Sequence, residues 1–265
     1  MTRLKNLFSL QGKTALVAGG AGLLGGEIAD ALAEQGANLV IASRDIRKCK
    51  KKCEQLLLDF PNIKVKALSI DLTKPSTIEK CVSDSENAFG NLDILVTCAW
   101  SGKKNSWETI NDDDWNHDIE VCLNGVYRLI KASTNALKKT EGVILNIGSM
   151  YGLVAPDYSL YEGVPQSNPP SYGAAKAGII QLTRYLGSFL APHKIRVNCI
   201  SPGPFPFQEV LDEFPEFKKR LTEKNPMKRL GIAHEIKGTA ALLCSDASSY
   251  MTGQNISIDG GWTIW

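Results

Sequence analysis

The stretch that decides the fold is Thr14-Ala-Leu-Val-Ala-Gly19-Gly-Ala-Gly22-Leu-Leu-Gly25-Gly26, close to the start of the chain. The apolar run predicts a buried strand, and the residues after Gly22 have apolar side chains at helical spacing. Glycines between a strand and a helix permit a tight turn and let the backbone approach a ligand closely. The helix N-terminus favours the negative charge of a pyrophosphate. We therefore predict a dinucleotide-binding turn, against the alternative of a glycine-rich turn without a ligand, with contacts from Gly19, Gly22, Leu24 and Gly25.

Short apolar runs alternate with longer amphipathic stretches along the rest of the chain. Strands are predicted at 14–18, 38–42, 65–70, 92–96, 143–147, 195–200 and 255–258, with helical patterns between them. Strands separated by helices of this length form right-handed βαβ crossovers. The sequence predicts a doubly wound α/β fold of the Rossmann type, with about seven mostly parallel strands and helices on both faces. No linker or repeat interrupts the pattern, so residues 1–265 are expected to form a single dinucleotide-binding catalytic domain.

Two long stretches break this alternation, and both follow the carboxyl ends of predicted strands. Residues 153–170 carry four prolines, and residues 204–226 begin in a proline-rich run and continue as a polar helix from about Gln208 to Lys224. Open α/β sheets bind ligands at this edge, so both segments are expected to act as lids. Tyr161 and Glu162 in the first segment could hydrogen-bond hydroxyl groups of a substrate.

The composition is that of an ordinary globular protein, with 43% apolar and 22% charged residues. A net charge of +2 gives no reason to expect nucleic acid or an acidic membrane as a partner. Neither a signal peptide nor a run of about 18 apolar residues is evident, so a cytoplasmic location is expected. The seven cysteines include no CxxC pair, which favours reduced thiols and no metal. The basic run at 47–52 is interpreted as a solvated helix face.

The end of the second predicted strand carries Ser43-Arg44, followed by Asp45. In dinucleotide-binding folds an acidic residue here favours the 2′-hydroxyl of the adenosine ribose, and an arginine favours a 2′-phosphate. A hydroxyl donor beside a guanidinium suits a phosphate, so NADP(H) is predicted to be preferred over NAD(H). Asp45 keeps NAD(H) open, because it could neutralise Arg44 or face the ribose itself. Asp71 and Leu72, just past the third strand, are placed to contact the adenine.

Three further residues indicate proton transfer. Tyr172 and Lys176 lie four residues apart in a predicted helix and therefore share a face. A free phenol has a pKa of about 10 and transfers protons poorly at neutral pH, whereas a neighbouring ammonium stabilises the phenolate. Ser149, near the end of the fifth strand, could hold a substrate oxygen in line for that proton. A tyrosine and a lysine at this spacing also occur on ordinary helices, but here they follow the glycine turn and the serine, which indicates acid–base catalysis with a nicotinamide.

Several motifs along the chain form a set. They are the glycine turn, Asp71, Ser149, Tyr172-Gly-Ala-Ala-Lys176, Arg196-Val-Asn198, Ser201-Pro-Gly203, and Thr252-Gly-Gln with Asp259-Gly-Gly261. Together they resemble the short-chain dehydrogenase/reductase family over essentially the whole chain. The resemblance implies catalysis by Ser149, Tyr172 and Lys176, with Lys176 also binding the nicotinamide ribose. It further implies assembly as a homotetramer or homodimer, and a cofactor site that includes Ala99, Pro202 and Gly203.

The chain departs from this family at three positions. Leu23 replaces a glycine in the turn, a spacing similar to that of the longer sugar-nucleotide epimerases and dehydratases, whose extra C-terminal substrate domain is not expected here. Trp100 ends Thr97-Cys-Ala-Trp100 where the family usually has Asn-Asn-Ala-Gly, and it is expected to line the substrate pocket or to pack under the lid. Cys122 stands where the family has a fourth catalytic residue, an asparagine, whose hydrogen bonds a thiol cannot make.

Three hypotheses about function follow. The first is an NAD(P)-dependent oxidoreductase that acts through Tyr172 on a carbonyl or secondary alcohol of a small molecule. Four stretches resemble a subgroup associated with bacterial surface-sugar and flagellin-glycan biosynthesis: Met150-Tyr-Gly-Leu-Val-Ala-Pro-Asp157, Tyr161-Glu-Gly163, Asn168-Pro-Pro170 and Gly261-Trp-Thr-Ile-Trp265. This resemblance implies a sugar-derived substrate. The second, motivated by Cys122, is a cofactor-binding protein with weak or no turnover that acts as a sensor or assembly subunit. The third, suggested by the glycine spacing, is a sugar epimerase or dehydratase that recycles its cofactor.

Overall fold

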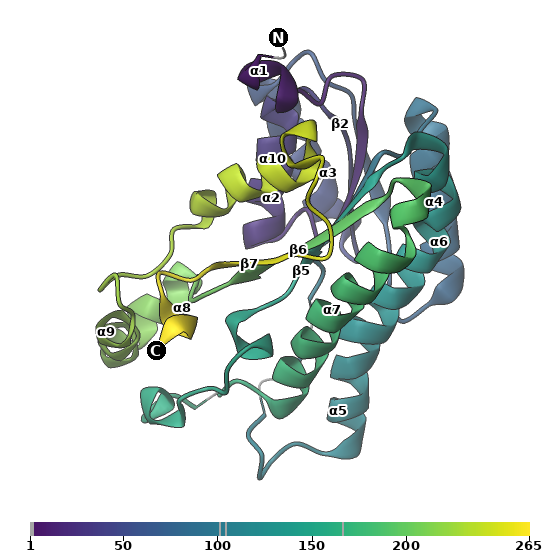
Figure 1. The fold of residues 1–265 in the computed structure, drawn as a ribbon. Helices are drawn as coiled ribbons and strands as arrows, with labels where there is room; N and C mark the ends of the chain where they lie inside the picture. The colour runs from purple at the N-terminus through teal and green to yellow at the C-terminus, as the bar shows by residue number, and fades with distance from the viewer. Residues whose placement is uncertain (1–2, 101, 104, 166) are drawn as a thin grey trace.

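The computed structural model describes residues 3–100, 102–103, 105–165 and 167–265. Its centre is a seven-stranded sheet in the order β3-β2-β1-β4-β5-β6-β7, in which all neighbouring strands run parallel (Figure 1). The strands are β1 (Thr14–Ala18), β2 (Asn38–Ser43), β3 (Val65–Ser69), β4 (Ile94–Thr97), β5 (Val143–Ile147), β6 (Arg196–Pro202) and β7 (Asn255–Ile258). The predicted doubly wound α/β fold is confirmed.

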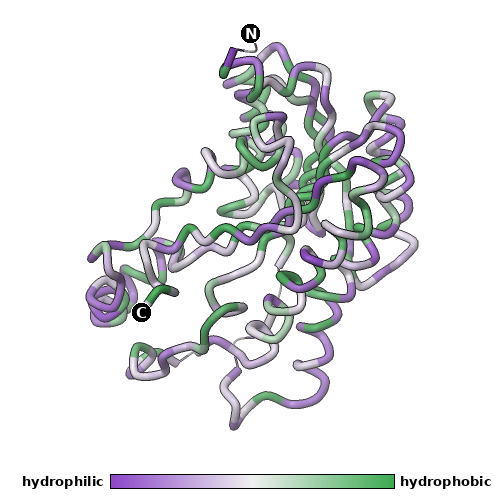
Figure 2. The backbone as a smooth tube through the Cα atoms, in the orientation of Figure 1, coloured by the Kyte–Doolittle hydropathy of each residue, from purple (hydrophilic) through white to green (hydrophobic). Residues whose placement is uncertain are grey.

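Helices cover both faces of the sheet, because alternate side chains of each buried strand point to opposite faces. On β1, Val17 enters one apolar core and Leu16 enters the other. Figure 2 shows the hydrophobic stretches gathered in the central strands. The first core is closed by α2 (Leu23–Glu34), α3 (Ile46–Asp59) and α10 (Lys237–Cys244), and the second by α4 (Pro75–Phe89), α6 (Gly125–Thr140) and α7 (Pro170–Phe189).

A π-helical turn joins two helices on the second face. The short helix α5 (Asp112–Ile119) continues through Glu120–Asn124, where the turn is widened by one residue, into α6. Such widened turns are rare and are often found at functional sites. Cys122 lies within this turn and is buried. No helix among the described residues is both long enough and apolar enough to cross a membrane.

The two segments expected to act as lids lie next to each other at the carboxyl edge of the sheet. The first contains a single 3-10 turn at Tyr158–Tyr161, and the second contains α8 (Gln208–Glu213) and α9 (Pro215–Lys224). The polar helix predicted from Gln208 to Lys224 is broken at Phe214, which has φ of −125° and ψ of 73°, because a proline at the next position disfavours the helical conformation of the residue before it. The Arg220 guanidinium of α9 donates to the carbonyl oxygen of Leu160 at 2.9 Å, so the two segments are tied together.

Candidate active site

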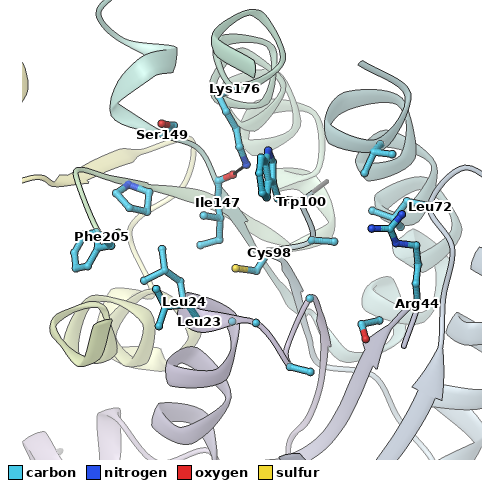
Figure 3. Close-up of a pocket in the computed structure, with 18 of the residues that line it drawn as sticks. Leu23, Leu24, Arg44, Leu72, Cys98, Trp100, Ile147, Ser149, Lys176 and Phe205 are labelled. Carbon is cyan, nitrogen blue, oxygen red and sulfur yellow. Dashed lines mark hydrogen bonds between the residues drawn. The ribbon is translucent and has the colours of Figure 1, made fainter. Parts of the chain in front are cut away.

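One cavity of about 510 Å³ opens at the carboxyl ends of β1, β2, β4, β5 and β6 (Figure 3). This is the edge where the strand order reverses around β1, the expected ligand site of a doubly wound sheet. The cavity brings together most of the residues expected to act in the site. They are Gly19, Gly22, Leu24, Gly25, Ser43, Arg44, Asp71, Leu72, Ala99, Trp100, Ser149, Tyr172, Lys176, Pro202 and Gly203.

Two glycines of the turn, Gly19 and Gly25, have no room for a side chain. Gly19 has φ of +87°, and a Cβ there would lie 2.6 Å from the backbone nitrogen of Ala99. A Cβ on Gly25 would lie only 2.2 Å from the carbonyl oxygen of Gly19. Gly22 is the N-cap of α2 and makes no side-chain hydrogen bond, and Gly22, Leu23, Leu24 and Gly25 at this end of the helix line the cavity. This cradle fits a pyrophosphate, because backbone donors and the helix dipole both favour an anion.

Two cations line the cavity beyond β2. Arg44 and Lys48 both line it, whereas Arg47, between them, has a 90% exposed side chain and does not. Asp45 also lines it, but its carboxylate caps α3 by accepting from the backbone N–H of Arg47 at 2.9 Å. That backbone hydrogen bond is the main cause of the lowered pKa of Asp45. Lys48 belongs to the run interpreted from sequence as a solvated helix face, and it was missed as a site residue.

The residues after β3 form the wall beside these cations. The Asp71 carboxylate accepts from the backbone N–H of Thr73 at 3.1 Å and from its hydroxyl at 2.8 Å. Burial alone would raise the pKa of Asp71, but these hydrogen bonds and nearby Lys74 lower it overall. Leu72 is buried at the cavity wall. The carboxylate therefore stays ionised and orders the turn in which both residues lie.

Ser149, Tyr172 and Lys176 meet at the other end of the cavity. The Lys176 ammonium donates to the carbonyl oxygen of Ile147 at 2.7 Å and lies 5.7 Å from the centre of the Tyr172 ring. The Ser149 hydroxyl accepts from the backbone N–H of Tyr151 at 3.1 Å. Its own proton remains available to a substrate oxygen, since a hydroxyl can donate and accept at once. This arrangement can hold an oxygen atom and move a proton to or from it.

Buried polar contacts fix the elements that carry these three residues. Asn146 of β5 accepts from the Thr97 hydroxyl at 2.7 Å and donates to Thr183 of α7 at 2.9 Å. Gly152, just after Ser149, lies so close to α7 that a Cβ there would be 2.8 Å from the backbone of Lys176. The strand end and the helix are thus held at one separation, which fixes the serine relative to the tyrosine.

Aromatic side chains form part of the wall of the cavity that contains Tyr172. The ring of Trp100 meets that of Tyr172 at 90°, with 6.1 Å between the ring centroids. Trp100 also lines the cavity, which was the first of the two placements expected from the sequence. Phe205 and Phe207, which follow β6, also line the cavity and were not expected from sequence. The sequence feature that could have indicated them is Pro202-Gly-Pro-Phe-Pro-Phe207, in which two phenylalanines precede a polar helical stretch.

Tyr161 and Glu162 are not among the residues that line this cavity. The Tyr161 hydroxyl is 3.0 Å from that of Tyr151, and its ring packs against Phe217 at 5.3 Å. Burial raises the pKa of Tyr161, so it is a neutral phenol in this contact. Glu162 is exposed, and its backbone oxygen accepts from Arg220. Contact of these two residues with a substrate therefore stays a prediction that requires the segment to move.

The cysteines near the site are neutral thiols or buried packing residues. Cys98 lines the cavity, and burial raises its pKa to about 11, which disfavours a thiolate. Cys122 packs in a small apolar cluster with Val121 and Ala175, and does not line the cavity. Across the described ranges there is no group of three or more His, Cys, Asp or Glu residues that could hold a metal ion.

Comparison with known proteins places this geometry among oxidoreductases. The profile of the family described as enoyl-(acyl carrier protein) reductase matches residues 19–263. Sorbose reductase of Candida albicans is 34% identical over 263 residues, which cover 97% of this chain and 89% of the relative.

Two crystal structures are similar along nearly the whole chain. A short-chain type dehydrogenase/reductase from Mycobacterium marinum superposes with a TM-score of 0.87 and 28% identity, covering 99% of each chain. A gluconate 5-dehydrogenase from Burkholderia cenocepacia, in complex with NADP and tartrate, gives a TM-score of 0.88 and 26% identity, covering 99% of this chain and 100% of the other.

Proposed function

Because this chain belongs to the short-chain dehydrogenase/reductase family of oxidoreductases, we propose that it interconverts a carbonyl and a secondary alcohol of a small molecule with NADP(H). The observation that carries the proposal is one continuous cavity, with Arg44 and Lys48 at one end, Ser149, Tyr172 and Lys176 at the other, and the glycine cradle in the same lining. A dinucleotide is an elongated ligand whose pyrophosphate joins an adenosine end to a nicotinamide end, and these three parts need the three kinds of surroundings. The cradle, the helix N-terminus and the two cations all fit such a ligand.

The reaction assigns a separate task to each of the three residues. When bound, the nicotinamide would supply or accept the hydride. Ser149 donates a hydrogen bond from its hydroxyl to the substrate oxygen, keeps its proton, and so orients that oxygen. Tyr172 transfers a proton to that oxygen in reduction and takes it back in oxidation. Lys176, fixed by the Ile147 carbonyl, places its ammonium 5.7 Å from the centre of the Tyr172 ring, where it can interact with negative charge that develops during the reaction.

We propose NADP(H) as the preferred cofactor. Arg44 and Lys48 line the end of the cavity that follows β2, where the adenosine ribose would lie. Asp45 is engaged in capping α3, so its charge is compensated by backbone donors. The similar gluconate 5-dehydrogenase was crystallised with NADP, which supports the same choice here.

Removing either cation should weaken NADPH binding selectively. Arg44→Ala and Lys48→Ala are each expected to raise the Kd for NADPH by about 10-fold, because each loses an ion pair with the 2′-phosphate. The Kd for NADH should change by less than about threefold, since NADH has no such phosphate. Lys50→Ala is the matched control, because this exposed lysine of the same helix does not line the cavity. Calorimetric titration of each variant with both cofactors makes the measurement, and equal losses for NADPH and NADH would contradict the assignment.

We propose a polyhydroxylated carbonyl compound as the substrate. The similarity to a sorbose reductase and to a gluconate 5-dehydrogenase supports this class. The test is a panel of ketoses and keto-aldonates, with NADPH and NADH oxidation followed at 340 nm. NADPH-dependent reduction of at least one member supports the proposed function. Cofactor binding without turnover of any ketone or alcohol would instead support a binding protein.

A further inference from the structure

Asp118 is a buried carboxylate that the proposed reaction does not use. It lies in the last turn of α5 and is 1% exposed. Aspartate is almost never this buried unless its oxygens are well satisfied, because removing a carboxylate from water is costly. Its carboxylate oxygens accept from two neutral donors that belong to different segments of the chain. Both of these segments also carry a residue of the catalytic pocket.

The first donor belongs to the helix that carries the catalytic tyrosine. The hydroxyl of Ser171 donates to Oδ2 of Asp118 at 2.6 Å, and Ser171 is immediately followed by Tyr172. The first turn of α7 begins at Pro170, and its N-cap, Pro169, makes no side-chain hydrogen bond to the helix. The carboxylate therefore holds this turn from outside. An anion near the N-terminus of a helix is also favoured by the helix dipole.

The second donor belongs to the segment that carries the aromatic wall. The backbone N–H of Lys103 donates to Oδ1 of Asp118 at 3.1 Å. A Cβ on Gly102 would lie 3.1 Å from the same oxygen, so this backbone is in close contact with the carboxylate. Trp100 lies two residues before Gly102, and its ring meets the ring of Tyr172 edge to face. The Asp118 carboxylate thus contacts both the helix turn that carries Tyr172 and the backbone that follows Trp100.

We propose that Asp118 is a positioning residue that fixes Tyr172 relative to Trp100. The inference rests on the proposed function only for its effect on turnover, whereas the placement of the two rings can be measured without a substrate. A carboxylate suits this task because it offers two acceptor oxygens in a fixed plane, one for each segment. A nonpolar side chain of similar size would leave the Ser171 hydroxyl and the Lys103 N–H without this acceptor.

Three substitutions and a control test the proposal. Asp118→Val removes both acceptors at nearly constant size, and Ser171→Ala removes only the helix contact. Asp118→Asn is the conservative rescue, since its amide can accept from Lys103 and donate to the Ser171 hydroxyl. Asp113→Val, at an exposed position of the same helix, is the control. For each variant, kcat, KM, the NADPH Kd and the thermal midpoint are measured. The fluorescence emission of Trp100 is obtained by subtracting the spectrum of the same variant that also carries Trp100→Phe.

The expected result is a fall in kcat without loss of cofactor binding. Asp118→Val should lower kcat by about 10–100-fold and shift Trp100 emission, with the NADPH Kd within about threefold of wild type. Ser171→Ala should lower kcat by about 3–10-fold and add little in the Asp118→Val background. Asp118→Asn should stay within about threefold of wild type and keep the Trp100 emission.

Two outcomes would overturn the proposal. Unchanged kcat and unchanged Trp100 emission in Asp118→Val would show that the carboxylate positions neither ring. Parallel losses of kcat, of the number of NADPH-binding sites and of the thermal midpoint in Ser171→Ala, with the same losses in Asp118→Asn, would show a role in overall stability instead. If wild type turns over no carbonyl or alcohol, the proposed function fails, but the Trp100 emission still decides whether Asp118 sets the contact.

Discussion

Tyr172→Phe is expected to lower kcat by about 10²–10⁴-fold, the range that a positioned general acid–base contributes. The substitution removes one oxygen atom and keeps the ring. The edge-to-face contact with Trp100 and the 5.7 Å approach of the Lys176 ammonium to the ring should both remain. The NADPH Kd should therefore stay within about threefold of wild type. Steady-state kinetics with the best ketone of the panel, beside calorimetric NADPH titration, separates the two effects.

Tyr151→Phe is the matched control for this prediction. Tyr151 is also a largely buried tyrosine close to Ser149, but its hydroxyl pairs with that of Tyr161 and it does not line the cavity. Its loss should cost about 1 kcal/mol of stability, the usual value of one hydrogen bond, and leave kcat nearly unchanged. Full activity in Tyr172→Phe, or equal losses in both variants, would refute the role assigned to Tyr172.

Gly25→Ala is expected to abolish NADPH binding, with the Kd raised by at least about 100-fold or the folded protein lost. The added Cβ would lie 2.2 Å from the carbonyl oxygen of Gly19, a distance at which the backbone itself must shift. Because we propose that the turn holds the pyrophosphate through its backbone, a shift there should remove several contacts at once. Titration with NADPH and a thermal melt of the same sample measure both effects.

Gly26→Ala is the control at the neighbouring position. A Cβ there would lie 3.7 Å from the end of the Lys52 side chain and 3.9 Å from the carbonyl oxygen of Gly20, both ordinary contacts. Alanine is the better helix former, so this variant should gain about 0.5–1 kcal/mol of stability and bind NADPH as wild type does. Normal NADPH binding by Gly25→Ala would mean that the cofactor does not rest on this turn.

The fold could be predicted from the sequence because its strands are short, apolar and separated by amphipathic helices. The predicted bounds agree with the structure at β1, β5 and β7 and differ by no more than two residues elsewhere. The exceptions lie where local pattern carries little information. The polar segment from Gln208 to Lys224 was predicted as one helix, but Pro215 divides it into α8 and α9. The π-helical turn at Glu120–Asn124 has a sequence pattern like that of an ordinary α-helix. This turn packs against α7, a tertiary contact that the local pattern does not reveal.

The glycine turn and the tyrosine–lysine pair could be predicted because their spacing is local. Lys48 could not, because facing the cavity depends on α3 beginning at Ile46. Helix starts are uncertain by a residue or two, and each residue turns the helix by about 100°. Asp118 was missed for a related reason: it follows Asp112-Asp-Asp114 in a polar helix, and nothing local distinguishes the buried carboxylate from the exposed ones. Its burial comes from residues about fifty positions away in α7.

The strand order has a consequence for how the chain folds. β1 lies inside the sheet, between β2 and β4, with Ala15 opposite Ile94 of β4. At a synthesis rate of about 5–20 residues per second, β1 leaves the ribosome roughly 4–16 s before that partner exists. The nascent chain therefore carries an apolar strand with one open edge during this interval, and pairing of such distant segments is slow. Both ends of the cofactor cavity come together only after β6 has been made, so the cofactor can stabilise only the late stages of folding.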